Sequence, residues 1–167
     1  MFPRLRSLIT RQGMSRSFQA CYFESWPPAS NAQLKSLLDS VPWLPSEYVE
    51  FLATTNGCVL EFFIFYGLGV DHPFPSDQRQ RIIESYGRDQ WFAVGHDCAG
   101  DVIAINKSGV VATAGSDPPP DQPIPLCKDF RSMIEDICCG QGYSDYFNGD
   151  VENSEWFGHI KSLGWAN

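Results

Sequence analysis

The stretch Trp91–Asn106, WFAVGHDCAGDVIAIN, decides the fold. Two apolar runs, 91–94 and 102–105, flank a polar break that contains Gly95 and Gly100. Short apolar runs separated by turn residues predict two paired antiparallel strands, and the glycines supply the backbone angles that such a connection needs. A third run follows at 110–114. The sequence therefore predicts a three-stranded meander at the centre of the fold.

Two helices are predicted before the meander. Ser30 and Gln33 match a capping box, and leucines at helical spacing follow, which predicts a helix over 31–40. A second helix is predicted to begin at Leu44-Pro45, because proline suits the first turn of a helix. Its apolar stripe consists of Tyr48, Phe51 and Leu52, and Asn56-Gly57 ends it.

The other segments complete an α+β pattern. The sequence predicts one strand over 58–66, a polar helix over 76–86, a proline-dense loop over 116–125, and helices over about 128–139 and 154–163. The expected fold is a central antiparallel sheet, built around the meander, with flanking helices. Residues 21–167 are interpreted as a single domain.

Residues 1–20 are interpreted as a basic N-terminal arm outside this domain. Arginine and serine are frequent there and acidic residues are absent. Three explanations stay open: a disordered arm, a segment similar to a transit peptide, and a translation start at Met14 that makes residues 1–13 non-native.

The charge of the chain is uneven. Four of the twelve basic residues lie before Ser17, so the rest of the chain carries eight basic residues against all twenty acidic ones, a net charge of −12. An acidic body repels nucleic acid and favours basic protein partners, although an acidic surface also serves solubility alone.

Cysteine usage and hydropathy indicate a cytoplasmic protein. The six cysteines include no CxxC pair, and no secretory signal is evident, so reduced and buried thiols are expected. No apolar run approaches the roughly 18 residues of a membrane span, so no membrane contact is predicted.

The sequence offers weak signals for chemistry. His96-Asp97 suggests a general base, but neighbouring side chains on an extended chain point apart, and no nucleophile elbow is present. His96-x-Cys98 is the only close His/Cys pair, so no metal and no cofactor are expected. Asp101, at a strand start, is expected to bond nearby backbone amides and fix the hairpin.

Three pieces in this order resemble the SUKH superfamily, which groups Smi/Knr-like fungal cell-wall-synthesis regulators with bacterial immunity proteins. The first is Leu44-Pro45-x-x-Tyr48-x-x-Phe51-Leu52-x-x-x-Asn56-Gly57. The second is Ala93-Val-Gly95-x-Asp97-x-x-Gly100-Asp101-x-Ile103-x-Ile105, and the third is Leu126-Cys-x-x-Phe130-x-x-Met133-Ile134. Two features depart from the family pattern: Leu38-Asp-Ser-Val-Pro42 replaces its E-x-x-LG, and residues 1–20 and 143–167 have no counterpart.

The resemblance implies a non-catalytic binding protein with an α+β fold. Bacterial members occlude a cognate toxin, often a nuclease, and an acidic surface would speed association with a basic toxin. We expect the partner to contact acidic residues that flank the loops of the sheet, namely Glu61, Asp71, Asp89, Asp97 and Asp101.

Two other functions stay open. The first is a regulatory or scaffolding interaction module unrelated to toxins, as in the eukaryotic members. The second is a small hydrolase that uses His96 and Asp97. The sequence leaves the partner and the oligomeric state undetermined.

Overall fold

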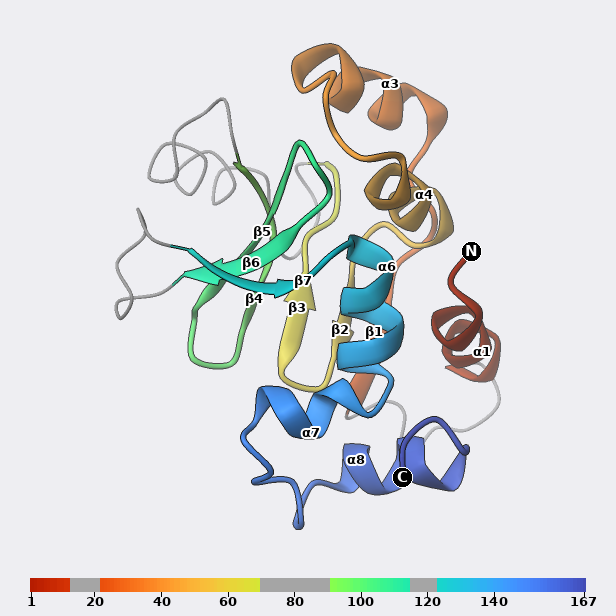
Figure 1. Ribbon diagram of the computed structural model, residues 1–167. Helices are drawn as coiled ribbons and strands as arrows, with labels where there is room; N and C mark the ends of the chain where they lie inside the picture. Colours follow the sequence, from red (N-terminus) through yellow and green to blue (C-terminus); the bar gives the residue numbers. More distant parts are fainter. Residues whose placement is uncertain (13–21, 70–90, 115–122) are drawn as a thin grey trace.

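A computed structural model describes residues 1–12, 22–69, 91–114 and 123–167, and shows an α+β fold (Figure 1). The described strands form one seven-stranded antiparallel sheet in chain order. They are β1 (Phe23–Ser25), β2 (Cys58–Leu60), β3 (Phe63–Phe65), β4 (Trp91–Asp97), β5 (Val102–Asn106), β6 (Val111–Ala114) and β7 (Ile124–Cys127). The predicted meander is confirmed as β4, β5 and β6. Strand β4 runs to Asp97, so it includes part of the predicted break.

The single strand predicted over 58–66 is wrong. The chain reverses at Glu61 and Phe62, and β2 pairs with β3 through Leu60 and Phe63. Glu61 adopts a φ of 51°, a backbone region that favours glycine or asparagine, so the sequence carries no turn signal here. Both strands bury alternate residues, which explains why the hairpin resembles one continuous apolar strand.

Strand β7 begins within the predicted proline-dense loop, at residues 124 and 125. It contains Pro125 and pairs only with β6 in the described sheet. Proline cannot donate a hydrogen bond to a ladder, but an edge strand tolerates it because one side has no neighbouring strand. The loop prediction is therefore wrong for 124–125, and the short strand β1 at the opposite edge was not predicted.

The helix predictions are confirmed where the structure describes them. Helix α3 (Asn31–Ser40) has the expected capping box, in which the Ser30 hydroxyl accepts from the Gln33 amide and the Gln33 side chain accepts from the Ser30 amide. The predicted helices that follow are α4 (Ser46–Thr54), α6 (Phe130–Ser132) continued by the π-helix η1 (Met133–Cys138), and α8 (Glu155–Ser162). Helix α7 (Gly142–Tyr146) was not predicted. The helix predicted over 76–86 lies outside the described residues.

One large apolar core lies between the sheet and α4, α6 and η1. The rings of Tyr48, Phe51 and Phe130 contact one another with centroids 5.1–6.0 Å apart, and none of these side chains is exposed. Phe65 of β3 and Phe92 of β4 complete the cluster from the sheet. Two of the expected motif residues, Tyr48 and Phe51, therefore have packing roles. Leu44 is also buried, and Pro45 occupies the N-cap position of α4 without a side-chain capping hydrogen bond.

Asn56 and Gly57 hold the chain after α4. The Asn56 side-chain amide donates to the Leu68 carbonyl at 2.8 Å, and its side-chain carbonyl oxygen accepts from the Leu68 amide at 2.6 Å. The Gly57 φ of 89° supports the predicted left-handed glycine after the helix. Since Asn56 is 9% exposed, these bonds satisfy a buried polar group and fix the segment after β3 against α4.

Gly95 has a different role from the one expected. Its φ is not positive, but a β-carbon there would lie 2.3 Å from the Ile64 carbonyl oxygen on β3. The glycine therefore permits close approach of two strands beside the bulge of the β4–β5 pair. Gly100, in the β4–β5 turn, has the expected positive φ of 84°.

Replacing Gly95 with alanine is expected to lower the free energy of unfolding by about 1–3 kcal/mol, because backbone atoms would have to move. Gly158→Ala is a suitable control, since a β-carbon in α8 meets nothing within 4 Å. That substitution should stabilise the protein by about 0.5–1 kcal/mol, because glycine disfavours a helix. Urea unfolding measures both changes, and equal effects of the two variants would contradict the close approach.

The N-terminal arm predicted to lie outside the domain is, over residues 3–12, a helix of the core. Helix α1 (Pro3–Gln12) packs against β1 and η1. Phe2, Leu5 and Leu8 are fully buried, and the Phe2 ring contacts Phe51 at 6.1 Å. A repeat of apolar residues every three positions supplies this buried stripe, and the basic residues around it obscured the pattern. The rest of the predicted arm, 13–20, lies outside the described residues.

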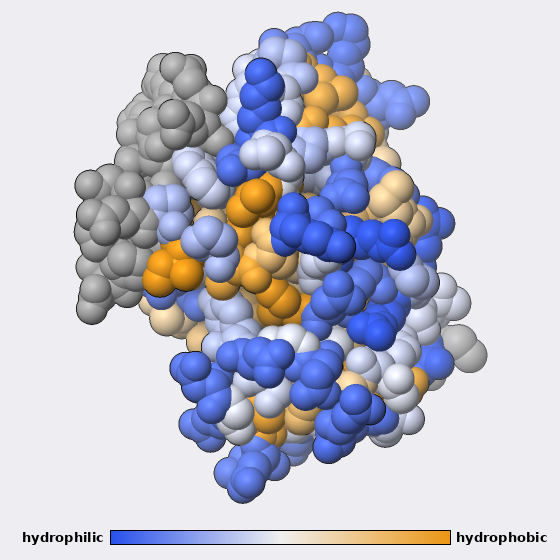
Figure 2. Space-filling model, in the orientation of Figure 1, coloured by the Kyte–Doolittle hydropathy of each residue, from blue (hydrophilic) through white to orange (hydrophobic). Residues whose placement is uncertain are grey.

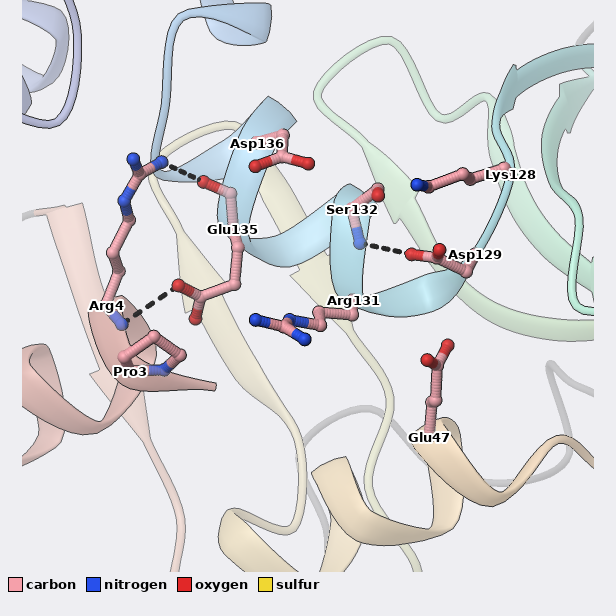
Figure 3. A pocket seen from close by; sticks show the side chains of 9 residues that line it. All are labelled: Pro3, Arg4, Glu47, Lys128, Asp129, Arg131, Ser132, Glu135 and Asp136. Atoms are coloured by element: carbon pink, nitrogen blue, oxygen red, sulfur yellow. Dashed lines mark hydrogen bonds between the residues drawn. The ribbon is translucent and has the colours of Figure 1, made fainter. Parts of the chain in front are cut away.

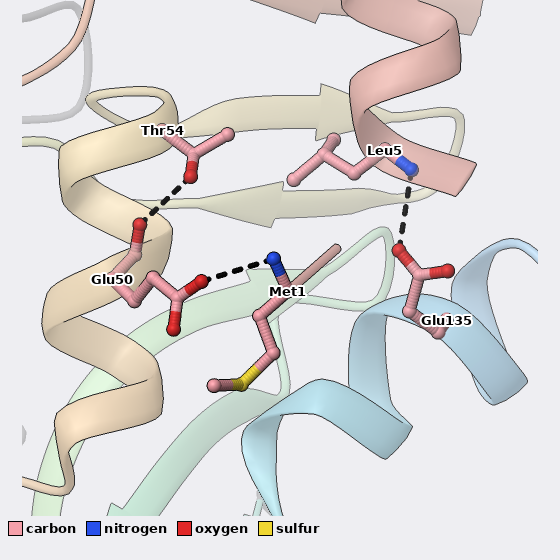
Figure 4. Close-up of polar contacts among 5 residues, drawn as sticks. All are labelled: Met1, Leu5, Glu50, Thr54 and Glu135. Atoms are coloured by element: carbon pink, nitrogen blue, oxygen red, sulfur yellow. Dashed lines mark hydrogen bonds and ion pairs between the residues drawn. The ribbon is translucent and has the colours of Figure 1, made fainter. Parts of the chain in front are cut away.

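Glu135 of η1 fixes the start of α1. Its carboxylate accepts from the Arg4 amide at 3.0 Å (Figure 3) and from the Leu5 amide at 3.2 Å (Figure 4), two donors that a helix N-terminus leaves unpaired. The Arg4 guanidinium donates to the Glu135 and Cys139 carbonyls, in the region where the π-helical turn widens. The Met1 amino group lies 3.0 Å from the Glu50 carboxylate of α4. Polar contacts thus hold both sides of the N-terminal segment.

Five of the six cysteines lie in the described ranges, and all five are free thiols. Cys58, Cys138 and Cys139 are buried, and burial raises the pKa of all three thiols. Cys98, in contrast to the expected burial, is exposed in the β4–β5 turn. Among the described helices, none is both long and apolar enough to cross a membrane.

Candidate protein-binding surface

One end of the molecule is strongly acidic. The turns β2–β3 (61–62) and β4–β5 (98–101) lie at the end of the sheet where α7 and α8 pack, opposite α3 (Figure 1). We call these turns, Asp97 and the segment 142–155 the acidic end. It carries Glu61, Asp97, Asp101, Asp145, Asp150, Glu152 and Glu155, and its sequence contains no lysine or arginine. Figure 2 shows mostly hydrophilic side chains on the visible face of this end.

Asp97 organises the β4–β5 turn. One carboxylate oxygen accepts from the Ala99 amide at 2.9 Å and from the Asp101 amide at 3.0 Å. The other accepts from the Tyr146 hydroxyl of α7 at 2.7 Å. The side chain is 6% exposed, so it serves the turn and not the surface. The hairpin-fixing role expected of Asp101 therefore belongs to Asp97.

Glu61 organises the β2–β3 turn in a similar way. Its carboxylate accepts hydrogen bonds from the Tyr143 hydroxyl of α7 and from the Ser154 hydroxyl before α8. Partial burial raises the pKa of Glu61, and the two hydroxyl donors oppose that shift. Two carboxylates on two turns thus hold successive tyrosines of one helix, which makes the acidic end a single connected unit.

Aromatic rings pack beneath these hydrogen bonds. Phe63 lies 4.9 Å from Tyr146 and 6.4 Å from Tyr143, measured between ring centroids. Phe147 contacts Phe63 at 5.9 Å and Phe62 at 5.6 Å. Phe62 itself is 42% exposed. The acidic end therefore has a base of packed aromatic rings and an exposed ring at its surface.

The structure brings together three of the five predicted contact residues. Partial burial raises the pKa of Cys98 most, and the charges of Asp97 and Glu61 raise it further. Both carboxylates therefore lie near Cys98, which places the two turns near each other. Asp101 lies beside Asp97. Burial raises the pKa of Asp101, and the neighbouring Asp97 charge raises it further. Asp71 and Asp89 lie outside the described residues.

His96 and Asp97 have separate hydrogen-bond partners. His96 Nδ1 lies 2.8 Å from the Tyr66 hydroxyl, whereas Asp97 bonds the β4–β5 turn and α7. Successive residues of a strand point to opposite faces, which agrees with these different partners. The hydrolase hypothesis receives no support from this arrangement.

Burial lowers the pKa of His96 and outweighs the neighbouring Asp97 charge, which acts to raise it. A histidine with a lowered folded pKa stabilises the protein fully above its unfolded pKa of about 6.5, and this contribution is lost as the pH falls. The free energy of unfolding should therefore fall from pH 7 to pH 5 by more in the wild type than in His96→Gln. Denaturant unfolding at both pH values tests this, and identical falls would contradict the burial effect.

Two cavities differ in charge. The first, of about 350 Å³, lies between the start of α1, the start of α4 and α6 (Figure 3). Its walls mix cations with anions, including Arg4, Lys128, Arg131, Glu47 and Asp129, so it favours neither sign of charge. The second, of about 370 Å³, opens at the acidic end and is lined by Tyr22, Glu61, Phe62, Asp150, Asn153, Ser154 and Glu155. Only the second combines one sign of charge with an exposed aromatic ring.

Sequence reasoning missed α7 and the concentration of acidic residues over 142–155 in this surface. No helix or strand was predicted over 143–153, between the helices predicted over 128–139 and 154–163. A signal was present, because Tyr143, Tyr146 and Phe147 are spaced to share one helical face. Four carboxylates without a basic residue, between 145 and 155, were a second signal.

The described residues contain no group of three or more histidine, cysteine, aspartate or glutamate side chains that could hold a metal ion. No family model matches the chain, and no curated protein is significantly similar to it.

Proposed function

We propose that this chain is a non-catalytic protein-binding domain of the immunity type, which binds and neutralises a basic toxin through its acidic end. The observation that carries the proposal is the charge of that end: seven carboxylates and no lysine or arginine over two turns and residues 142–155. The active surfaces of nucleases are basic because they bind phosphates, so a nuclease is a suitable toxin class.

The hydrogen bonds that connect the acidic end support the proposal. Glu61 and Asp97 fix two turns against α7 through Tyr143 and Tyr146. A surface that is ordered before binding loses less conformational entropy when the partner docks. Charge complementarity adds mainly to the association rate, which suits an inhibitor that must act before its toxin does.

The SUKH resemblance remains part of the proposal. Motif residues Asn56, Gly57, Gly95 and Gly100 have backbone roles in the structure, and the α+β fold is compatible with the family. A binding role without catalysis is supported by His96 and Asp97, which bond separate tyrosines. A cytoplasmic location is proposed from the free thiols of the described cysteines.

The test is a titration of the purified protein with the product of the neighbouring gene, followed by an assay of that product's activity. We expect a 1:1 complex and loss of toxin activity at equimolar protein. The proposal fails if no neighbouring gene encodes a toxin and no nuclease is neutralised. If the chain binds only basic cellular proteins, and this binding weakens with salt, the regulatory module is favoured instead. A pull-down that recovers only a secreted effector would exclude the regulatory module.

A further inference from the structure

The cavity at the acidic end has the features of a pocket for one side chain. Its volume of about 370 Å³ exceeds that of a single amino-acid side chain, and its walls come from three separate segments: Tyr22 before β1, the β2–β3 turn, and residues 150–155. Because these segments are tied to one another, the pocket is formed in the absence of a ligand. The Tyr22 hydroxyl donates to Glu155 at 2.9 Å, and the Ser154 hydroxyl donates to Glu61 at 3.3 Å.

Phe62 provides an exposed aromatic wall. It is one of three large hydrophobic side chains exposed in the described part of the chain, and it is 42% exposed although the Phe147 ring contacts it at 5.6 Å. An aromatic ring at the rim of a cavity, supported from behind, is typical of a binding position. The flat face of such a ring attracts a cation, and a planar guanidinium can stack on it.

The charge of the lining selects among possible ligands. Glu61, Asp150 and Glu155 contribute carboxylates, and no lysine or arginine is among the described residues that line the cavity. Asn153 adds a side-chain amide whose oxygen accepts hydrogen bonds. Anions are repelled here, whereas a cation with several donors could pair with the carboxylates and the amide together.

We propose that this pocket receives one arginine side chain of a basic partner protein, with the guanidinium stacked on Phe62 and paired with Asp150 and Glu155. The proposal rests on the proposed function, because it names the group through which the partner is recognised. Arginine fits better than lysine, since its planar fork of donors can stack and pair with carboxylates at once. A lysine ammonium is a point charge that cannot do both.

The experiment is an NMR titration of the ¹⁵N-labelled full chain with the blocked tripeptide acetyl-Gly-Arg-Gly-amide. The matched control peptide carries citrulline, which has nearly the same shape and no charge. We expect the arginine peptide to shift the amide signals of residues 61–62 and 150–155, and to bind at least about tenfold more tightly than the citrulline peptide. The lysine peptide is expected to bind more weakly than the arginine peptide.

Variants separate the pocket from general charge effects. Phe62→Ala is expected to weaken arginine binding about two- to fivefold through the lost ring contact. Asp150→Asn/Glu155→Gln should weaken it more, whereas Asp39→Asn/Glu47→Gln, which removes two charges on α3 and α4, should leave it unchanged. The amide spectrum of each variant reports whether it remains folded.

Equal binding of the arginine and citrulline peptides, or shifts centred away from the pocket, would overturn the proposal. The pocket proposal would also be overturned if a toxin that the chain neutralises bound wild type and Phe62→Ala with equal affinity. That result would leave the proposed function intact. Selective arginine binding here by a chain that neutralises no toxin would support the pocket and remove only the immunity role.

Discussion

Replacing Leu5 with alanine is expected to lower the free energy of unfolding by about 2–5 kcal/mol. The Leu5 side chain is fully buried between α1 and the body of the domain. Its removal leaves a cavity in a core that also contains Phe2 and Leu8, and the neighbouring Glu135 contacts hold the helix in place, so the gap cannot readily close. Urea unfolding followed by fluorescence measures the change.

The control for this prediction lies in the same helix. Thr10 is exposed, and its hydroxyl donates only to the Arg6 carbonyl within α1. Thr10→Ala is expected to change the free energy of unfolding by less than about 0.5 kcal/mol. If both substitutions had similarly small effects, the packing of α1 against the core would be contradicted. Residues 1–12 would then be an arm outside the domain, as the sequence predicted.

Asp97→Ala is expected to cost about 3 kcal/mol of stability. The substitution removes the acceptor for the Ala99 and Asp101 amides and for the Tyr146 hydroxyl. Hydrogen bonds to charged groups contribute about 1.5–3 kcal/mol each, but the turn is partly exposed, so water replaces some of them. Thermal and denaturant unfolding both measure the loss.

Asp101→Ala is the matched control in the same turn. Asp101 carries the same charge, and its side chain has no hydrogen bond to another described residue, so a change below about 0.5 kcal/mol is expected. Should Asp101→Ala destabilise as much as Asp97→Ala, the assignment of the turn-fixing role to Asp97 would be wrong.

Local patterns predicted much of the fold because they depend on neighbouring residues. The capping box at Ser30 and the apolar runs of the meander determine structure within a few positions. The errors arose where tertiary context decides. Pro125 is tolerated because β7 lies at an edge, and the Glu61 turn is held by α7 and Ser154.

The candidate surface was predictable only in part. Its charge can be read along the chain, and Glu61, Asp97 and Asp101 were named from their positions beside turns. Their partners could not be named, because Tyr143 lies 82 positions from Glu61 and Tyr146 lies 49 positions from Asp97. Nor does the sequence distinguish a buried carboxylate that fixes a turn from an exposed one that meets a partner. Burial makes Asp97 structural, so the proposed partner contacts are assigned to Asp150 and Glu155, which line the open cavity.

The central claim is that a basic protein docks on the acidic end, and the association rate constant tests it most directly. Stopped-flow mixing with the basic product of the neighbouring gene should show a rate that falls at least about tenfold as salt rises from about 50 to 500 mM. At low salt, Asp150→Asn/Glu155→Gln should associate more slowly than wild type, and Asp39→Asn/Glu47→Gln should not. A rate that is independent of salt and equal in all three proteins would contradict the claim.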